Sequence, residues 1–274
     1  MKRENSRGGL KVEKLNIKRL KYLYILYQII VSPLLLLLTI LTGVTTIVGC
    51  TLMNASWWSY YPGKWWSWAM IRLLLLPVRV EGREHLEASQ SYVIIPNHQG
   101  AFDIFLVYGF LGRHFKWMMK SELRHLPLVG KACEAAGFIF VDQKGGPKKM
   151  RATHDRARAI LQGGTSVVVF PEGARTWDGR MRRFKRGAFQ LADELQLPLL
   201  PVTINGSFDV LPRTRGFSFV TWHPLSLTIH PPVRMQGQGS DAERDAMQQT
   251  FDIIQSALTT RPVEPQPGSY NPED

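Results

Sequence analysis

The chain has 274 residues, of which 45% are hydrophobic, and its formal net charge at pH 7 is +12. This length accommodates one globular domain of roughly two hundred residues together with a membrane segment. The two cysteines, Cys50 and Cys133, lie far apart in the sequence and do not suggest a disulfide framework or a metal site, so we expect both to be reduced and structural. The positive charge stands beside a lipid-like stretch, so we expect anionic membrane lipids and phosphate-bearing substrates as partners, and no nucleic acid.

The N-terminal segment Met1–Lys21 is rich in Lys and Arg, and we expect it to face the cytoplasm. The following stretch, Tyr22–Gly63, contains no Lys, Arg, Asp or Glu, and its part from Ile25 to Met53 is dense in Leu, Ile and Val. This run exceeds the roughly twenty residues that a helix needs to cross a bilayer. A signal peptide is the alternative, but the run is too long and lacks a small-residue cleavage site, so we expect it to be retained.

Basic residues flank the apolar segment on both sides, and the positive-inside rule places both flanks in the cytoplasm. One full crossing would separate them. A helical hairpin over residues 22–76 would keep them together, either as two crossings or as a helix pair inserted in one leaflet. Pro33 and Gly43 supply material for a bend, and Trp65–Pro77 is the apolar stretch that returns. We therefore expect a protein of the cell inner membrane with its catalytic domain on the cytoplasmic face.

Aromatic residues follow the apolar run in consecutive pairs. This arrangement resembles the aromatic belt of a membrane–water interface, because a buried cluster of a soluble core would place its rings on one helix face. The residues are Trp57, Trp58, Tyr60, Tyr61, Trp65, Trp66 and Trp68.

Beyond the hairpin, apolar runs of strand length alternate with stretches of helical length. Such alternation indicates an α/β fold, which we expect to be a mixed sheet covered by helices over residues 77–260. Residues 261–274 contain four prolines and few apolar residues, which is typical of a disordered tail. The expected strands are Pro77–Val80, Tyr92–Ile95, Phe115–Met119, Phe138–Val141, Ser166–Phe170, Leu199–Ile204 and Leu225–Ile229, and the expected helices lie near Phe102–Leu111, Pro147–Leu161, Gly187–Leu195 and Asp241–Leu258.

The segment Asn97–Asp103, with the sequence NHQGAFD, directly follows one of these expected strands. It places the imidazole of His98 and the carboxylate of Asp103 five positions apart, where a strand gives way to a helix. That geometry suits a carboxylate that orients a histidine as a general base. A single histidine near a helix start is more often a capping or core residue, but the pairing and a second motif favour catalysis.

The second motif, Phe170–Thr176 with the sequence FPEGART, follows the β-branched run Ser166–Val169. The chain should turn there at the carboxyl edge of a sheet, where ligands of open α/β sheets collect. Gly173 allows a backbone N–H to approach an anion, and Arg175 can hold a phosphate through two parallel N–H bonds. The basic run that follows could hold anionic headgroups or an acidic carrier protein, although a solvated surface explains each residue singly: Arg180, Arg182, Arg183, Lys185 and Arg186.

Together these segments resemble the glycerolipid acyltransferase family, and most closely its 1-acyl-sn-glycerol-3-phosphate acyltransferases. The first motif of that family, NHX4D, is matched by Asn97, His98 and Asp103, and its third motif, Phe-Pro-Glu-Gly-Thr-Arg, is matched by Phe170–Gly173 and Arg175. Weaker elements of the family occur in the right order between Val78 and Ile229, namely Lys120–Leu123, Gly137–Phe140, Phe184–Ala188 and Leu200–Val202.

The resemblance implies transfer of a fatty acyl group from acyl-CoA or acyl carrier protein to the free hydroxyl of lysophosphatidic acid. The product would be phosphatidic acid for phospholipid synthesis, and the acyl donor is a co-substrate, so no cofactor is expected. His98 would be the catalytic base, and Asp103 would orient it. The residues expected to bind the lysophospholipid acceptor are Asn97, Lys120, Glu172, Gly173 and Arg175.

Two positions depart from the family pattern: Ala174 replaces a Thr, and Gln143 replaces an Arg at the end of the second motif. Thr176 is the candidate substitute for the missing hydroxyl. An acyltransferase for another lysolipid, such as a lyso-ornithine lipid, therefore stays open, as does a non-catalytic lipid-binding membrane module. A serine hydrolase would need a GxSxG elbow, which this sequence lacks. His98 and Asp103 find no further ligands at useful spacing, so we expect no metal.

Overall fold

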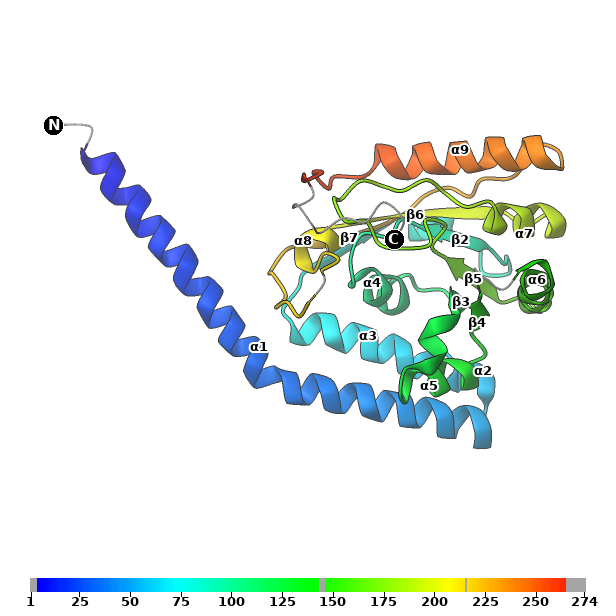
Figure 1. The fold of residues 1–274 in the computed structure, drawn as a ribbon, viewed down its shortest axis with the longest axis horizontal. Coiled ribbons are helices and arrows are strands. Elements are labelled where there is room, and N and C mark those ends of the chain that lie inside the picture. The colour runs from blue at the N-terminus through cyan, green and yellow to red at the C-terminus, as the bar shows by residue number, and fades with distance from the viewer. Residues whose placement is uncertain (1–3, 143–145, 215, 265–274) are drawn as a thin grey trace.

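The computed structural model describes residues 4–142, 146–214 and 216–264. Its first element, α1 (Glu4–Leu52), is a single helix that bends once and extends beyond the rest of the molecule (Figure 1). Pro33 lies inside α1, and a proline both removes one backbone hydrogen bond and crowds the preceding turn, which bends a helix. From Lys18 to Leu52 the helix is long and apolar enough to cross a membrane, and only 6% of its most apolar stretch is buried in the protein.

The chain reverses direction after α1 rather than within it. The short helix α2 (Ala55–Trp58), capped by the side chain of Asn54, precedes α3 (Tyr61–Leu73), which packs back along α1. A bend near Pro33 agrees with the sequence-based expectation, but Gly43 makes no turn and lies inside α1. The surrounding Leu, Ile and Thr residues all continue the helix, so one glycine does not end it.

Two tyrosines fasten α1 to the end of α3. The hydroxyls of Tyr24 and Tyr27 donate hydrogen bonds to the carbonyls of Leu74 and Leu73, at 2.6 and 2.7 Å. The C-terminal end of α3 therefore lies beside the middle of α1, and the two helices run antiparallel.

Within the described residues, seven strands form one sheet in the order β1-β7-β6-β2-β5-β3-β4. β6 and β7 pair antiparallel, and the other described pairs are parallel. The central strands β2 and β6 are buried along their whole length, as expected when helices cover both faces of a sheet. The strands are β1 (Val78–Glu81), β2 (Val93–Pro96), β3 (Phe115–Lys120), β4 (Ile139–Val141), β5 (Ser166–Val169), β6 (Leu199–Asn205) and β7 (Leu225–Ile229).

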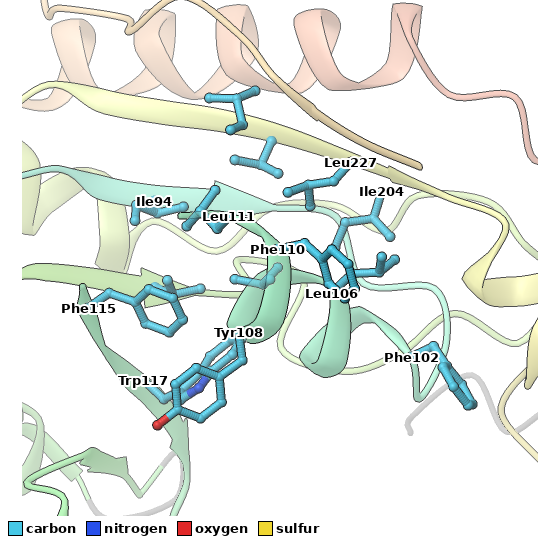
Figure 2. Packing of buried hydrophobic residues seen from close by; sticks show 14 of the residues in the cluster. Ile94, Phe102, Leu106, Tyr108, Phe110, Leu111, Phe115, Trp117, Ile204 and Leu227 are labelled. Carbon is cyan, nitrogen blue, oxygen red and sulfur yellow. The ribbon is translucent and has the colours of Figure 1, made fainter. Parts of the chain in front are cut away.

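Helices lie on both faces of this sheet, with α3 and α4 on one side and α7 and α9 on the other (Figure 1). On the first face, Leu106 and Phe110 of α4 pack with Ile94 of β2 and Ile204 of β6 in one buried cluster (Figure 2). The remaining helices are η1 (Arg83–His85), α4 (Asp103–Phe110), η2 (Ser121–His125), α5 (Val129–Ala135), α6 (Gly146–Gln162), α7 (Gly187–Leu195), α8 (Ser207–Val210) and α9 (Ser240–Ser256).

The expected α/β fold with a mixed sheet is confirmed. Each expected strand occurs within one residue of its predicted ends, and α7 has the predicted bounds Gly187–Leu195. The short helices α5 and α8 were not predicted, because elements of one or two turns carry too little periodic pattern.

The aromatic residues that follow α1 do not act as one set. Trp57, Trp65 and Trp68 are between 42% and 56% exposed, which suits an interfacial belt. Tyr60, in contrast, is 3% exposed, and its ring lies 5.6 Å from that of Tyr108 in the core. The belt interpretation therefore fits the three exposed tryptophans and not Tyr60.

The first residues of the expected tail are docked against the domain. The N–H of Val263 donates to the carbonyl of Asp178 at 2.8 Å, and just before the tail the hydroxyl of Thr260 donates to Gln99 at 2.7 Å. Residues 265–274 and Gln143 lie outside the described residues.

Candidate active site

The two sequence motifs lie side by side because their strands are parallel neighbours. β2 ends at Pro96 and β5 ends at Val169, so the NHQGAFD and FPEGART segments leave the sheet at the same carboxyl edge. The N–H of Thr176 donates to the carbonyl of His98 at 3.1 Å, which joins the two segments directly.

His98 and Asp103 form a hydrogen-bonded pair. The ring Nδ1 of His98 lies 2.8 Å from Oδ2 of Asp103, and the same oxygen accepts the backbone N–H groups of Gln99 and Gly100 at 2.6 and 2.9 Å. Asp103 is fully buried in the first turn of α4, where the helix dipole favours a carboxylate. Because Nδ1 faces the carboxylate, the ring presents Nε2 on its other side, and among the described residues Nε2 has no hydrogen-bond partner.

The imidazole is also held by an aromatic stack that sequence reasoning missed. The ring of His98 lies parallel to that of Phe170, with centroids 3.9 Å apart, and Phe170 in turn stacks on Trp117 at 5.7 Å. Phe170 was recognised only as the first residue of its motif, and no spacing in the sequence indicates that its ring covers the histidine. The side chain of His98 is 15% exposed, so one edge of the ring reaches solvent.

Asn97 is fully buried and joins the first motif to β6. Its Nδ2 donates to the carbonyl of Ile204 at 2.9 Å, and its Oδ1 accepts the N–H of Ile204 at 2.7 Å. Both ends of the amide are thus used by the protein backbone. This placement makes Asn97 the residue that fixes where β2 ends and the His98 segment begins.

Glu172 bridges the two motifs through backbone groups. Its Oε1 accepts the N–H of His98 at 2.7 Å, and its Oε2 accepts the N–H of Arg182 at 2.7 Å. Glu172 is 3% exposed, and burial raises its pKa to about 8, against the lowering effect of these two hydrogen bonds. The nearby carboxylate of Asp103 raises this pKa further.

Gly173 adopts a left-handed conformation, with φ of 75°, and its N–H donates to the carbonyl of Phe170 at 3.1 Å. A side chain would be strained at this turn, which explains the glycine. Arg175 is half-buried just beyond the turn, and its carbonyl accepts from Arg213 at 3.4 Å. In the part of the chain that the structure describes, its guanidinium makes no hydrogen bond or ion pair, so it is available to a ligand.

Thr176 does not replace the hydroxyl that is missing at Ala174. Its side chain is 1% exposed, and its Oγ1 donates to Oδ1 of Asp178 at 2.8 Å. The expectation failed because the chain turns between the two residues and points Thr176 inward. At this turn the protein offers an alanine methyl group in place of a hydroxyl.

Three cations surround the second motif. Lys185 is attached to the turn by its N–H, which donates to the carbonyl of Pro171 at 2.9 Å. Burial lowers the pKa of Lys185, and the positive charges of Lys120 and Arg182 lower it further. Lys120, which is exposed at the end of β3, is therefore close enough to add its charge to the same region. This positive potential favours an anionic ligand.

Gln99 is a further residue that sequence reasoning missed. It is fully buried, and its Nε2 donates to the carbonyl of Gly179 at 3.0 Å while its Oε1 accepts from Thr260. Gln99 thus links the first motif to the loop after the second motif and to the C-terminal segment. Over the described residues, no group of three or more His, Cys, Asp or Glu side chains could hold a metal ion.

Comparisons with known proteins match the part of the chain that contains both motifs. Residues 77–205 match the family model described as Acyltransferase. The chain is 33% identical over 181 residues to 1-acyl-sn-glycerol-3-phosphate acyltransferase alpha of Ovis aries, a match that covers 63% of this chain and 62% of that protein. The human protein of the same name is also 33% identical over 181 residues, with 63% of each chain covered. The chain thus spans less than two thirds of the length of these curated relatives.

A solved structure shares the fold. It is the 1-acyl-sn-glycerophosphate acyltransferase PlsC of Thermotoga maritima, with a TM-score of 0.69, 24% identity, and coverage of 87% of this chain and 95% of that one. The match supports the mixed α/β fold of the chain. Residues 77–205, the stretch that contains both motifs, are thus the part of the chain that resembles the Acyltransferase family.

Proposed function

We propose that this protein transfers a fatty acyl group from the thioester of acyl-CoA or acyl carrier protein to the hydroxyl of lysophosphatidic acid, giving phosphatidic acid. The observation that carries the proposal is the His98–Asp103 pair, whose histidine is joined to the turn of the second motif by the bond from its backbone N–H to Glu172. The names of the relatives support the same acceptor. The reaction requires no cofactor because the thioester is already activated.

In this mechanism, Nε2 of His98 accepts the proton of the acceptor hydroxyl while its oxygen attacks the thioester carbon. The new C–O bond forms, the C–S bond breaks, and the protonated imidazole returns its proton to the departing thiolate. Asp103 holds the ring in the required tautomer and stabilises the positive charge that develops on it. No covalent enzyme nucleophile is needed.

The phosphate of the acceptor is held by the second motif. Arg175 supplies a guanidinium that can form two parallel hydrogen bonds to phosphate oxygens, and Lys120 adds charge from the end of β3. Gly173 brings backbone close to the anion, and burial keeps Glu172 largely neutral below its pKa of about 8. Glu172 thereby shapes the turn without repelling the phosphate.

The N-terminal helices attach the protein to the membrane. Along α1, large apolar side chains such as Leu36, at 62%, and Leu37, at 51%, are exposed. α3 has 13 residues, and a helix of that length spans about 20 Å, which is shorter than the roughly 30 Å hydrocarbon core. The pair is therefore inserted in one leaflet, and the domain lies on the cytoplasmic face of the inner membrane, where its charge attracts anionic lipids.

The test is free-thiol release from acyl-CoA, and separately from acyl carrier protein, by the purified full chain with several acceptors. Lysophosphatidic acid should give the fastest release. Release only with lysophosphatidylethanolamine or a lyso-ornithine lipid would transfer the assignment to another lysolipid, and no release with any acceptor would indicate a non-catalytic module. Arg175→Gln should raise the KM for lysophosphatidic acid while leaving the KM for the thioester unchanged, whereas the matched change Arg151→Gln, at an exposed position of α6, should alter neither.

A further inference from the structure

Large apolar side chains are exposed together in the segment Phe217–Trp222, which we name the aromatic loop. Phe217, Phe219 and Trp222 are 87%, 38% and 53% exposed, and the rings of Phe217 and Phe219 lie 5.1 Å apart. Isolated exposed hydrophobic residues are common on protein surfaces, but several within six residues mark an interaction site. The aromatic loop contains no charged residue that would favour water.

The aromatic loop is fixed against the N-terminal helices. The N–H of Val220 donates to Oε1 of Gln28, and Nε2 of Gln28 donates back to the carbonyl of Val220, both at 2.9 Å. Gln28 is 6% exposed, so its side of this pair is buried. At the end of the loop, Nε1 of Trp222 donates to the carbonyl of Leu75 at 2.9 Å. These bonds hold the loop in place while its phenyl rings remain outside.

The surface around this attachment is also apolar. On α1, Leu26 and Ile29 flank Gln28 and are 53% and 51% exposed, and Leu75 after α3 is 57% exposed. The aromatic loop is therefore continuous with the surface of α1 for which membrane attachment is proposed above. A lipid bilayer fits this continuity, because the rings of Phe and Trp enter the interfacial region beside an apolar helix.

The aromatic loop is also connected to the active site. The segment that precedes it pairs Pro212 with Gly100, and the carbonyl of Leu211 accepts the N–H of Ala101 at 3.2 Å. Next to these residues, the guanidinium of Arg213 lies 4.0 Å from the ring centre of Trp177 and donates to the carbonyl of Arg175 in the second motif. A few residues thus separate the exposed rings from both motifs.

We propose that the aromatic loop is a second membrane-contact element, which inserts into the interfacial layer of the bilayer and holds the mouth of the active site at the lipid surface. The inference rests on the proposed membrane attachment of α1. Two contacts, the pair of α1 and α3 and the loop, would fix the orientation of the domain, whereas the helix pair alone would leave the domain free to tilt. A lysolipid could then reach His98 from the membrane.

Depth-dependent fluorescence quenching tests the contact. Single cysteines at Ser218, Leu37 and Gln249 are introduced into a Cys50→Ser, Cys133→Ser background and labelled with an environment-sensitive dye. The full chain is reconstituted in vesicles of phosphatidylethanolamine and phosphatidylglycerol that carry a shallow nitroxide lipid. Ser218→Cys keeps both phenylalanines, Leu37 reports α1, and Gln249 on α9 is the exposed control.

Quenching at positions 218 and 37, but not at 249, is the expected result. Quenching at position 37 without quenching at positions 218 and 249 would overturn the inference and leave the proposed attachment of α1 intact. No quenching at 37 would refute that attachment, and the inference with it. If a second copy of the chain covered the aromatic loop instead of a bilayer, position 218 would be shielded from aqueous iodide but would not be quenched by the nitroxide lipid. That result would also overturn the inference.

Activity supplies a second readout. The double variant Phe217→Ser, Phe219→Ser should lose about ten-fold in rate on an acceptor embedded in vesicles, because two interfacial anchors are removed. Its rate on a short-chain, water-soluble lysophosphatidate should change less than about two-fold, since the site itself is intact. The variant Phe217→Leu, Phe219→Leu keeps the apolar surface and should retain the vesicle activity. An equal loss on both acceptors would contradict a membrane role.

Discussion

The side-chain Oε1 of Glu172 accepts the backbone N–H of His98 at 2.7 Å, and this bond joins the turn of the second motif to the histidine of the first. The other oxygen of Glu172 accepts the N–H of Arg182, so one buried side chain holds three segments together. The proposed base and the cationic turn are therefore not independent parts. A change in the protonation or identity of Glu172 should alter both.

Glu172→Gln should change how stability depends on pH. The folded state raises the pKa of Glu172 from 4.5 to about 8, so between these values the folded chain binds more protons at this site than the unfolded chain. This residue should therefore make the free energy of unfolding fall as pH rises through that range. Thermal unfolding at pH 5 and pH 8 tests this dependence. The difference in Tm, taken as the unchanged protein minus the variant, should be smaller at pH 8 than at pH 5. An equal difference in Tm at both pH values would refute the raised pKa.

Gly100→Ala should destabilise the fold and displace the first motif. A methyl group at this position would overlap the carbonyl and hydroxyl oxygens of Ser207, and the first of these belongs to the backbone. Overpacking of this kind typically costs about 1–3 kcal/mol. Gly216→Ala is the matched control, because nothing lies within 4 Å of its added methyl group. Denaturant unfolding should show a lower free energy of unfolding for Gly100→Ala than for Gly216→Ala. Equal free energies would show that the contact between Gly100 and Ser207 is not tight.

Asp103→Asn should lower kcat while the protein stays folded. An amide oxygen can still accept the N–H groups of Gln99 and Gly100, but it cannot stabilise a positive imidazolium. The expected loss in kcat is about 10²–10⁴-fold, with a much smaller change in KM. Asp245→Asn, at an exposed position of α9, is the control and should match the unchanged protein. A variant with near-normal kcat would show that the carboxylate is dispensable.

Much of the fold could be predicted because its signals are local. The buried run Ser166–Val169 and the glycine turn after it lie within one short stretch, and so do His98 and Asp103. Each strand and each motif could therefore be recognised from its own residues. The meeting of the two motifs could also be predicted, because both follow strands at the carboxyl edge of a parallel sheet.

The remaining features depend on contacts between distant segments. The antiparallel direction of β7, the ring of Phe170 on His98, and the burial of Thr176 are set by packing that no short pattern records. Asn97 shows the same limit: it was expected to bind substrate, but both ends of its amide bond Ile204, more than a hundred positions away. A polar residue in a motif can serve the backbone as readily as a ligand.

The most direct test of the central claim is the kcat for thiol release from acyl-CoA with lysophosphatidic acid, measured for the unchanged protein and for His98→Ala. Removal of the base should lower kcat by about 10²–10⁴-fold while the KM for both substrates stays within a few-fold. His125→Ala, which changes an exposed histidine on η2, should leave kcat unchanged. A normal kcat for His98→Ala in a folded protein would contradict the assignment of His98 as the base.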